Sequence, residues 1–197
     1  MRTPQQLRST TSADAMVAAG LHLLEAGGLP AVTIAAVAAA AGTSNGALYH
    51  RFGDRNGLLL AMLDRALGDL EADTVEAFAR TSEEPDDDRA LEQLGCAAVA
   101  IFARRGAVMR AFLAGPAVSP QIEVRRREHS HRLATTVTGW LRDRLGASET
   151  QAQAAWRVVF ALGASRALFA DGDVSPVALS DDEMGAAIGR AVRALVT

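Results

Sequence analysis

The sequence predicts an all-α fold. Apolar residues recur with a helical period along nearly the whole chain, and no segment shows the alternation of a strand. Aromatic residues make up only 5% of the 197 residues, and alanine dominates the apolar fraction, which favours helix over sheet. We expect about nine helices, arranged as a three-helix unit over residues 1–54 and a helical bundle over residues 55–197.

The helices of the N-terminal unit are predicted from their caps. Ser12 can begin a first helix, which would end at the pair Gly27-Gly28. Thr33 caps a short run of Ile, Val and Ala, and Ser44 opens a third short helix. The unit therefore consists of one long helix and two short ones.

Six further helices are predicted in the remainder of the chain. Gly53-Asp54 marks the start of a long one, and the acidic stretch 81–88 after it is expected to be a solvated linker. A loop over residues 171–180 precedes the last helix. The predicted helical segments are residues 54–80, 91–102, 108–113, 119–145, 148–170 and 184–195.

Cysteine content and hydropathy exclude several classes of protein. Cys96 is the single cysteine, so neither an intramolecular disulfide framework nor a cysteine-rich zinc site can form. No run approaches the roughly 20 apolar residues that a membrane span requires, and the N-terminus lacks the apolar core of a signal peptide. These features predict a soluble, cytoplasmic protein with no membrane partner.

Charge is distributed unevenly along the chain. All 20 basic residues are Arg, and the net charge is −3. Residues 1–60 carry four Arg and three acidic residues, whereas the rest carries 16 Arg and 20 acidic residues. This excludes a strongly basic nucleic-acid binder, so any contact with DNA has to come from the small N-terminal unit.

The sequence contains no catalytic or metal-binding signature. His-Glu-x-x-His, Gly-x-Ser-x-Gly, P-loop and Gly-x-Gly-x-x-Gly patterns are all absent. His129 and His131 lie two residues apart in a predicted helix, so their side chains point to different sides. We expect no catalytic residue, no metal and no cofactor.

The two short helices have the proportions of a helix-turn-helix. Gly42 gives the turn between them its backbone freedom, and Leu48 and Phe52 share the face that would anchor the second short helix. Small residues at its start allow approach to base edges, and later polar ones can reach phosphates. The side chains left on or near its outer surface are Ser44, Asn45, Ala47, Tyr49, His50 and Arg51.

Residues 33–60 resemble the DNA-binding region of the TetR family of repressors. The resemblance covers about a quarter of the chain, and Arg55 stands where the family usually has Lys. The matching residues are Thr33, Val37, Ala38, Ala41, Gly42, Ser44, Gly46, Leu48, Tyr49, Phe52 and Leu58.

The resemblance implies roles for these residues in binding double-stranded operator DNA. Asn45, Gly46, Ala47 and His50 would face bases in the major groove. Thr33, Ser44, Tyr49 and Arg55 would hold phosphates, and Arg51 is counted among the DNA-binding residues because it lies on the same surface. An alternative for Tyr49 and His50 is that they pack against the fourth helix.

One departure from the family pattern concerns the second helix. Residues 34–41 carry no polar side chain, whereas many family members have Arg or Glu there. This puts the contribution of that helix to base reading in doubt. Arg2 and Arg8, on an N-terminal arm, could contact phosphates instead, or the arm could be a solvated tail.

The resemblance also implies a homodimer and a ligand cavity in the body. The last two long helices would form the interface, although the same residues could instead fill the core of one chain. The N-terminal units of the two chains, which we call the heads, would then lie about 34–36 Å apart and bind the two halves of a palindromic DNA site. The candidate interface residues are Trp156, Val159, Phe160, Met184, Ile188 and Leu195.

A cavity for a small apolar ligand is expected inside the fourth to eighth helices. Arg126 and His129 interrupt an apolar line along the seventh helix, where they could orient a ligand. The charged cluster 125–132 around them favours exposure to solvent instead. The candidate pocket residues are Phe78, Met109, Phe112, His129, Trp140 and Phe160.

Together these features predict a TetR-like repressor that ligand binding releases from its operator. Ligand entry would shift the fourth helix, and Gly53 and Gly57 near its start could absorb the motion. The alternative is a helical-bundle module for protein interaction that has no sequence-specific DNA binding.

Overall fold

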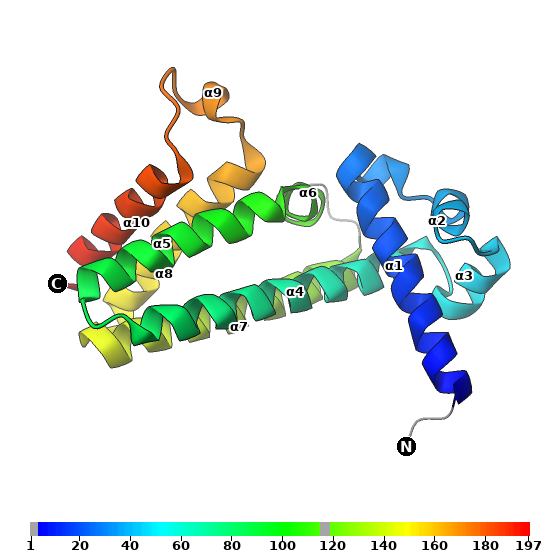
Figure 1. Ribbon diagram of the computed structural model, residues 1–197, viewed down its shortest axis with the longest axis horizontal. Coiled ribbons are helices and arrows are strands. Elements are labelled where there is room, and N and C mark those ends of the chain that lie inside the picture. The colour runs from blue at the N-terminus through cyan, green and yellow to red at the C-terminus, as the bar shows by residue number, and fades with distance from the viewer. Residues whose placement is uncertain (1–3, 115–118) are drawn as a thin grey trace.

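The computed structural model describes residues 4–114 and 119–197, and their side chains over residues 12–112 and 119–197. These ranges form helices without any strand, which confirms the predicted all-α class. A small unit of three helices lies at one end of an elongated helical body (Figure 1). Within these ranges, no helix has both the length and the apolar composition needed to cross a membrane.

The N-terminal unit contains α1 (Pro4–Ala31), α2 (Ile34–Ala40) and α3 (Asn45–Phe52). The predicted start of α1 at Ser12 was wrong, because the helix begins at Pro4. The predicted interruption at Gly27 and Gly28 is confirmed by their non-helical backbone angles, and a short helical stretch after them runs to Ala31. Gly28 has φ of 67°, so the pair bends the helix before its last turn. Arg8 therefore lies within α1 rather than on an arm, while Arg2 lies outside the described residues.

The body contains two long helices that lie side by side along its length, α4 (Arg55–Glu83) and α7 (Pro120–Leu145), with the other body helices stacked on them (Figure 1). The predicted starts at Asp54, Ser119 and Ser148 are confirmed as N-caps, and Gly146 ends α7 as expected. The remaining elements are α5 (Asp87–Arg104), α6 (Gly106–Met109), the π-helical turn η1 (Arg110–Ala114), α8 (Glu149–Leu168), α9 (Asp171–Val174) and α10 (Asp181–Val196).

Two predictions about the body helices need correction. The linker predicted over residues 81–88 is only three residues long, because α4 runs to Glu83 and Asp86 caps α5. The loop predicted over residues 171–180 contains the four-residue helix α9.

Helices α5 and α10 approach each other unusually closely, through glycine. A Cβ atom added at Gly95 would lie 2.1 Å from the carbonyl oxygen of Gly185, and one at Gly185 would lie 2.3 Å from Sγ of Cys96. Only residues without a side chain allow the two backbones to meet in this way. Gly163 makes a comparable contact with the ring of Phe102 in the same chain, so its small size is used inside the protomer.

One hydrophobic cluster joins the head to the body. Met16 and Val17 of α1 belong to the same cluster of buried side chains as Phe112 of η1 and Ile122 of α7. Burial of shared apolar surface resists separation of the two parts. The head is therefore packed on the body and not merely linked to it.

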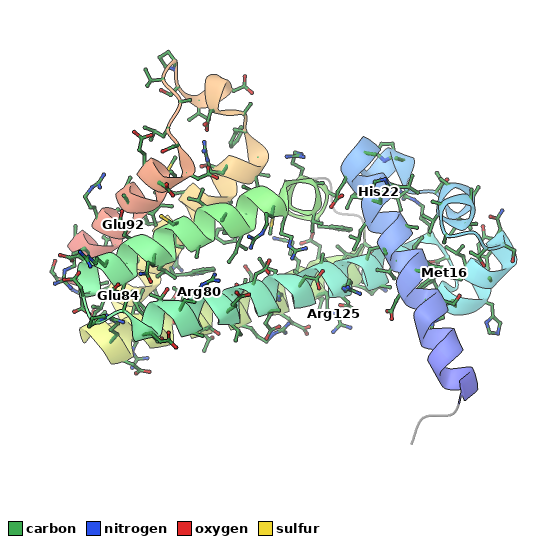
Figure 2. All side chains as sticks on the ribbon, in the orientation of Figure 1. Met16, His22, Arg80, Glu84, Glu92 and Arg125 are labelled. Atoms are coloured by element: carbon green, nitrogen blue, oxygen red, sulfur yellow. The ribbon has the colours of Figure 1, made fainter. Side chains whose placement is uncertain are left out.

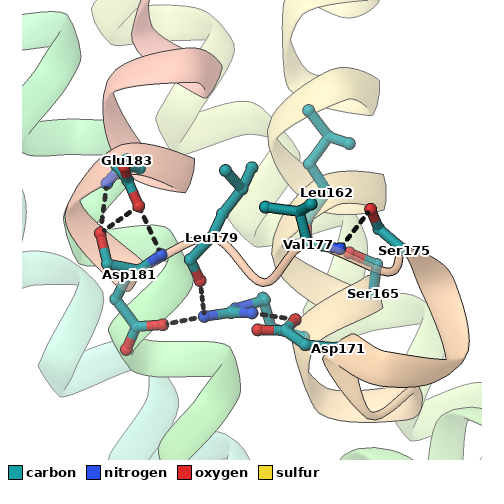
Figure 3. A network of polar contacts seen from close by, with 10 residues as sticks. Leu162, Ser165, Asp171, Ser175, Val177, Leu179, Asp181 and Glu183 are labelled. Carbon is teal, nitrogen blue, oxygen red and sulfur yellow. Dashed lines mark hydrogen bonds and ion pairs between the residues drawn. The ribbon is translucent and has the colours of Figure 1, made fainter.

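The connection between α8 and α10 projects from the body (Figure 1). Its ends are held by Arg166, which bonds to the carboxylates of Asp171 and Asp181 and donates to the carbonyl oxygen of Leu179 at 3.1 Å (Figure 3). The charged hydrogen bonds raise the pKa of Arg166 further above its ordinary value. A single arginine thus holds together the two ends of this connection.

Candidate functional site

Helix α3 presents a polar surface and is anchored from beneath. Leu48 is fully buried and Phe52 is half-buried, as their spacing predicted. Tyr49 is 54% exposed, and His50 and Arg51 beside it are also exposed. The alternative in which Tyr49 and His50 pack against the fourth helix was therefore wrong.

Thr33 and Ser44 cap the two short helices. The Thr33 hydroxyl accepts a hydrogen bond from the backbone N–H of Ala36 at 3.1 Å, and the Ser44 hydroxyl accepts one from Ala47 at 3.2 Å. Each hydroxyl keeps its own hydrogen free to donate, and both residues are exposed. The caps can therefore order the helices and still donate to a phosphate.

The first residues of α3 have small side chains. Asn45 and Gly46 are exposed, whereas Ala47 is half-buried against the hydrophobic cluster of the head. A Cβ atom at Gly46 would meet only the Ser44 hydroxyl, at 3.7 Å, so packing within the chain does not require glycine there. Because Gly46 has no side chain, another molecule could approach the backbone at the start of α3 closely.

Arg55 has a structural role that the sequence did not indicate. Its Nε donates to the carbonyl oxygen of Val32 at 2.6 Å, and a terminal nitrogen donates to that of Leu29 at 2.7 Å. The side chain therefore ties the first turn of α4 to the end of α1. Its predicted contact with phosphate stays a prediction.

Gly57 forms a second rigid contact at the junction of head and body. A Cβ atom there would lie 2.0 Å from the carbonyl oxygen of Phe52, so the end of α3 rests directly on the backbone of α4. This contact does not suit the predicted role of Gly57 as a hinge. Gly53, with φ of 80°, is the remaining candidate for motion.

The body contains a small cavity of about 40 Å³ between α4, α5, α7 and α8. Four of the predicted pocket residues line it, namely Met109, Phe112, His129 and Phe160. Its other lining residues are Leu63, Ala66, Leu67, Leu70, Phe102, Arg105, Val108, Arg126, Ser130 and Leu133.

The other two predicted pocket residues lie elsewhere. Phe78 lines a second cavity, also of about 40 Å³, with Trp156 and Val159 among its walls. Trp140 lines neither cavity: its ring stands edge-on to Phe78 at 5.7 Å between centroids, and its N–H donates to Ser82 at 3.3 Å. The hydrogen bond to Ser82 of α4 holds the Trp140 indole in a position outside the cavities.

The expected exposure of His129 was wrong, since its side chain is only 2% exposed and lines the first cavity. Its exposed charged neighbours include Arg125, Arg127 and Arg132. Burial lowers the pKa of the His129 imidazole below its ordinary value of 6.5, and the charge of Arg132 adds to this effect while Glu71 opposes it. The ring is accordingly neutral at pH 7.

Two of the six residues predicted for a dimer interface are buried within a single chain, and the other four are half-buried in it, so their part in an interface stays a prediction. Ile188 is fully buried and Val159 is 3% exposed, because both pack between α5, α8 and α10. Trp156 and Phe160 line the cavities. Met184 and Leu195 are half-buried against the same core as Ile188.

Residues 16–62 match the sequence family described as bacterial regulatory proteins, tetR family. The chain is also 40% identical over 70 residues to the HTH-type transcriptional regulator BetI of Burkholderia mallei, and 37% identical over 70 residues to BetI of Burkholderia ambifaria. The head of this chain is therefore similar in sequence to TetR-family regulators. Each of these alignments spans 36% of this chain and 36% of the BetI relative.

The fold of the whole chain is also that of TetR-family proteins. A TetR-family transcriptional regulator from Mesorhizobium loti superposes with a TM-score of 0.79 at 16% identity, over 95% of this chain and 96% of the other. A transcriptional regulator from Rhodococcus sp. RHA1 gives a TM-score of 0.67 at 23% identity, over 93% and 95% of the two chains. At these identities the similarity over the body is one of fold alone.

Proposed function

We propose that this TetR-family protein is a transcriptional repressor that binds a palindromic operator as a homodimer and is released by a ligand in its body. The division into a DNA-binding head over residues 1–54 and a ligand-binding and dimerisation body over residues 55–197 belongs to the proposal. The observation that carries it is the exposed surface of α3, where small residues precede polar ones over a buried Leu48 anchor.

Base reading is assigned to α3, because α2 has no polar side chain to offer. Asn45, Gly46 and Ala47 at the start of α3 would allow its backbone to approach base edges in the major groove. Tyr49, Arg51 and the two cap hydroxyls would hold the flanking phosphates, which fix orientation without reading sequence. His50 is the remaining exposed group that could reach a base.

The homodimer is proposed to form through the outward faces of α8 and α10. These faces carry small side chains that remain partly or fully exposed in the protomer, and small side chains allow helices to pack closely across a two-fold axis. Their small residues are Ala154, Val158, Ala161, Ala187, Ala191 and Ala194.

Coupling between cavity and head is proposed to pass through α6 and η1 as well as α4. Val108, Met109 and Phe112 line the cavity, and Phe112 shares a hydrophobic cluster with Met16 of α1. Arg110 anchors the same turn to the carbonyl oxygen of Ala167 at 2.7 Å. A ligand that displaces Phe112 would therefore press on α1 and change the orientation of the head.

Selection of binding fragments from random duplex DNA by the purified protein tests this function. An enriched palindrome is expected, and Tyr49→Ala should weaken its binding about tenfold, as expected for the loss of a phosphate hydrogen bond. Arg80→Ala provides the control, because Arg80 is 66% exposed on the body, away from the head (Figure 2). Arg55→Ala is less suitable, since it would also disturb the head.

The alternative is a helical-bundle module for protein interaction without sequence-specific DNA binding. The polar-free α2 and the small positive charge of residues 1–60 favour it. Failure to enrich any duplex at low salt would support this alternative and contradict the repressor. A protein that acts on operator DNA would work in the cytoplasm, which stays a prediction.

A further inference from the structure

The first cavity is lined by hydrogen-bond donors that have no acceptor. Nε of Arg105, Nε of Arg126 and Nε2 of His129 are all buried without a hydrogen-bond partner among the described residues. All three side chains line the same cavity, and His129 itself is 98% buried, being 2% exposed. A buried donor without a partner costs about 1–3 kcal/mol, so three at one site indicate a missing acceptor.

The tautomer of His129 follows from its neighbour. Nδ1 of His129 lies 3.5 Å from a terminal nitrogen of Arg132, and a guanidinium group can only donate. Nδ1 therefore accepts, and in the neutral ring the proton is carried by Nε2. The nitrogen left without a partner beside the cavity is thus an N–H donor.

The two arginines are positioned by their terminal nitrogens, which leaves the Nε–H groups for another molecule. Arg105 bonds to Asp73 at 2.9 Å and lies 3.6 Å from Asp69, while Arg126 bonds to Glu123 at 2.6 Å. None of these carboxylates lines the cavity. The only other polar lining side chain is that of Ser130, so the site offers donors and almost no acceptor.

The rest of the cavity is apolar and continues toward the second cavity. Leu70, Phe102 and Leu133 line both cavities and separate them. The only hydroxyl in the second lining set, that of Thr74, already donates to the carbonyl oxygen of Leu70 at 2.8 Å. Apart from Trp156, whose indole carries an N–H group, the other residues that line the second cavity have apolar side chains, so the path from the donors ends in a mostly apolar environment.

We propose that the ligand of this protein is an elongated amphiphile with a carboxylate head and an unbranched apolar tail. The carboxylate would accept hydrogen bonds from Arg105, Arg126 and His129, and charge-assisted bonds of this kind are roughly twice as strong as neutral ones. The tail would displace Leu133 or Phe102 and extend into the second cavity, because about 40 Å³ is too small to hold it. This inference rests on the proposed ligand-responsive function and replaces the expectation of a purely apolar ligand.

Binding by the full chain tests the proposal directly. Octanoate, decanoate and dodecanoate, each below its micellar concentration, are compared with the methyl ester and the primary amine of the same chain length. Isothermal titration and the shift in melting temperature report binding without DNA. We expect at least one carboxylate to bind about ten- to a hundredfold more tightly than its amine, with the ester between them.

Two variants and one control assign the donors. His129→Leu and Arg126→Gln should each weaken carboxylate binding about tenfold and affect the ester less. Arg127→Gln is the control, because Arg127 is exposed on the same helix and does not line the cavity. The melting temperature of each unliganded variant shows that it is folded.

Equal binding of carboxylate and amine, binding of no carboxylate in the series, or equal losses in the variants and the control would overturn the proposal. Failure of the inference can be separated from failure of the proposed function. A protein that binds a selected operator but no carboxylate refutes the ligand class alone. One that binds carboxylates through His129 and Arg126 but no DNA supports the ligand site and refutes the repressor.

Discussion

At the scale of single residues, the proposed ligand site would lower the stability of the unliganded protein at His129. Its ring is buried, and Nε2 has no partner in the part of the chain that the structure describes. Desolvating that N–H without an acceptor is unfavourable, and the loss is recovered only when a ligand supplies one. We therefore expect His129 to lower the free energy of unfolding of the unliganded protein and to increase its affinity for a ligand that carries an acceptor.

His129→Leu should therefore leave the unliganded protein at least as stable as wild type, with an increase in the free energy of unfolding of about 1 kcal/mol. The Leu side chain fills a similar volume but is apolar, so the unsatisfied N–H donor is removed. Urea denaturation followed by circular dichroism measures the difference. A decrease of more than about 1 kcal/mol would contradict the absence of a partner at Nε2, the ring nitrogen that does not face Arg132.

The buried imidazole also predicts a pH dependence. Burial lowers the pKa of His129 in the folded state below its ordinary value of 6.5, so the unfolded chain binds more protons there. Arg132 faces the ring with a charge that adds to this effect, and Glu71 opposes it. Stability should be unaffected above pH 6.5 and fall as the pH decreases below it toward the folded-state pKa. Thermal melts from pH 8 to 5 should show this fall, and His129→Leu should remove that part of it.

The sequence could predict which α3 residues are exposed but not which α7 residues are buried. Tyr49, His50 and Leu48 follow a short helical motif, so their faces were fixed by spacing. His129 stands within a run of exposed arginines, and only the packing of α4 and α8 around α7 shows that its face is covered. Trp140 was misplaced for the same reason, since its bond to Ser82 depends on where α4 ends.

At the scale of elements, the junction between α3 and α4 is built for rigidity. A Cβ atom at Gly57 would lie 2.0 Å from the carbonyl oxygen of Phe52, so the two backbones are in direct contact. The Arg55 side chain forms hydrogen bonds that connect the same turn of α4 to the end of α1. In the proposed mechanism, a movement of α4 would therefore carry α3 with it.

Gly57→Ala tests this contact. The added methyl group would collide with the backbone of Phe52, so we expect a loss of roughly 1–3 kcal/mol in the free energy of unfolding. Gly68→Ala is the matched control on the same helix, because a Cβ there would meet nothing within 4 Å. It should stabilise the protein by roughly 0.5–1 kcal/mol, since alanine is the better helix former. Denaturation that moves both variants in the same direction would contradict the role of Gly57.

Element boundaries were predictable where capping chemistry is strong. Asp54, Ser119 and Ser148 begin helices as expected, because their side chains accept from backbone N–H groups of the first turn. The short α9 and the glycine contact of α5 with α10 were not predictable. Both depend on partners far away in the sequence, such as Gly185 against Gly95.

At the scale of the whole molecule, the proposed dimer would use the outer faces of α8 and α10. The large apolar residues of these helices pack wholly or partly inside the protomer, so the proposed interface would rely mainly on the small ones. Hydropathy alone left both uses of these residues open, because it cannot separate a core from an interface.

Ala161→Arg tests the dimer. Ala161 is exposed on α8, and a long charged side chain there would block close packing across a two-fold axis. We expect the variant to shift from dimer to monomer in light scattering at micromolar concentration and to bind the selected palindrome more weakly. Ala79→Arg, at an exposed alanine on α4, should leave the mass unchanged. A dimer that persists in Ala161→Arg would place the interface elsewhere.

The measurement that tests the central claim most directly is the salt dependence of binding to the selected duplex by wild type, Arg51→Ala and Arg80→Ala. Both variants lose one exposed arginine, from α3 and from the far part of α4 respectively. If α3 lies in the major groove, Arg51→Ala should weaken binding and lower the slope of log K against log salt by about one, whereas Arg80→Ala should match wild type. Identical slopes for all three proteins, or a loss with Arg80→Ala alone, would contradict a DNA-reading role for this head.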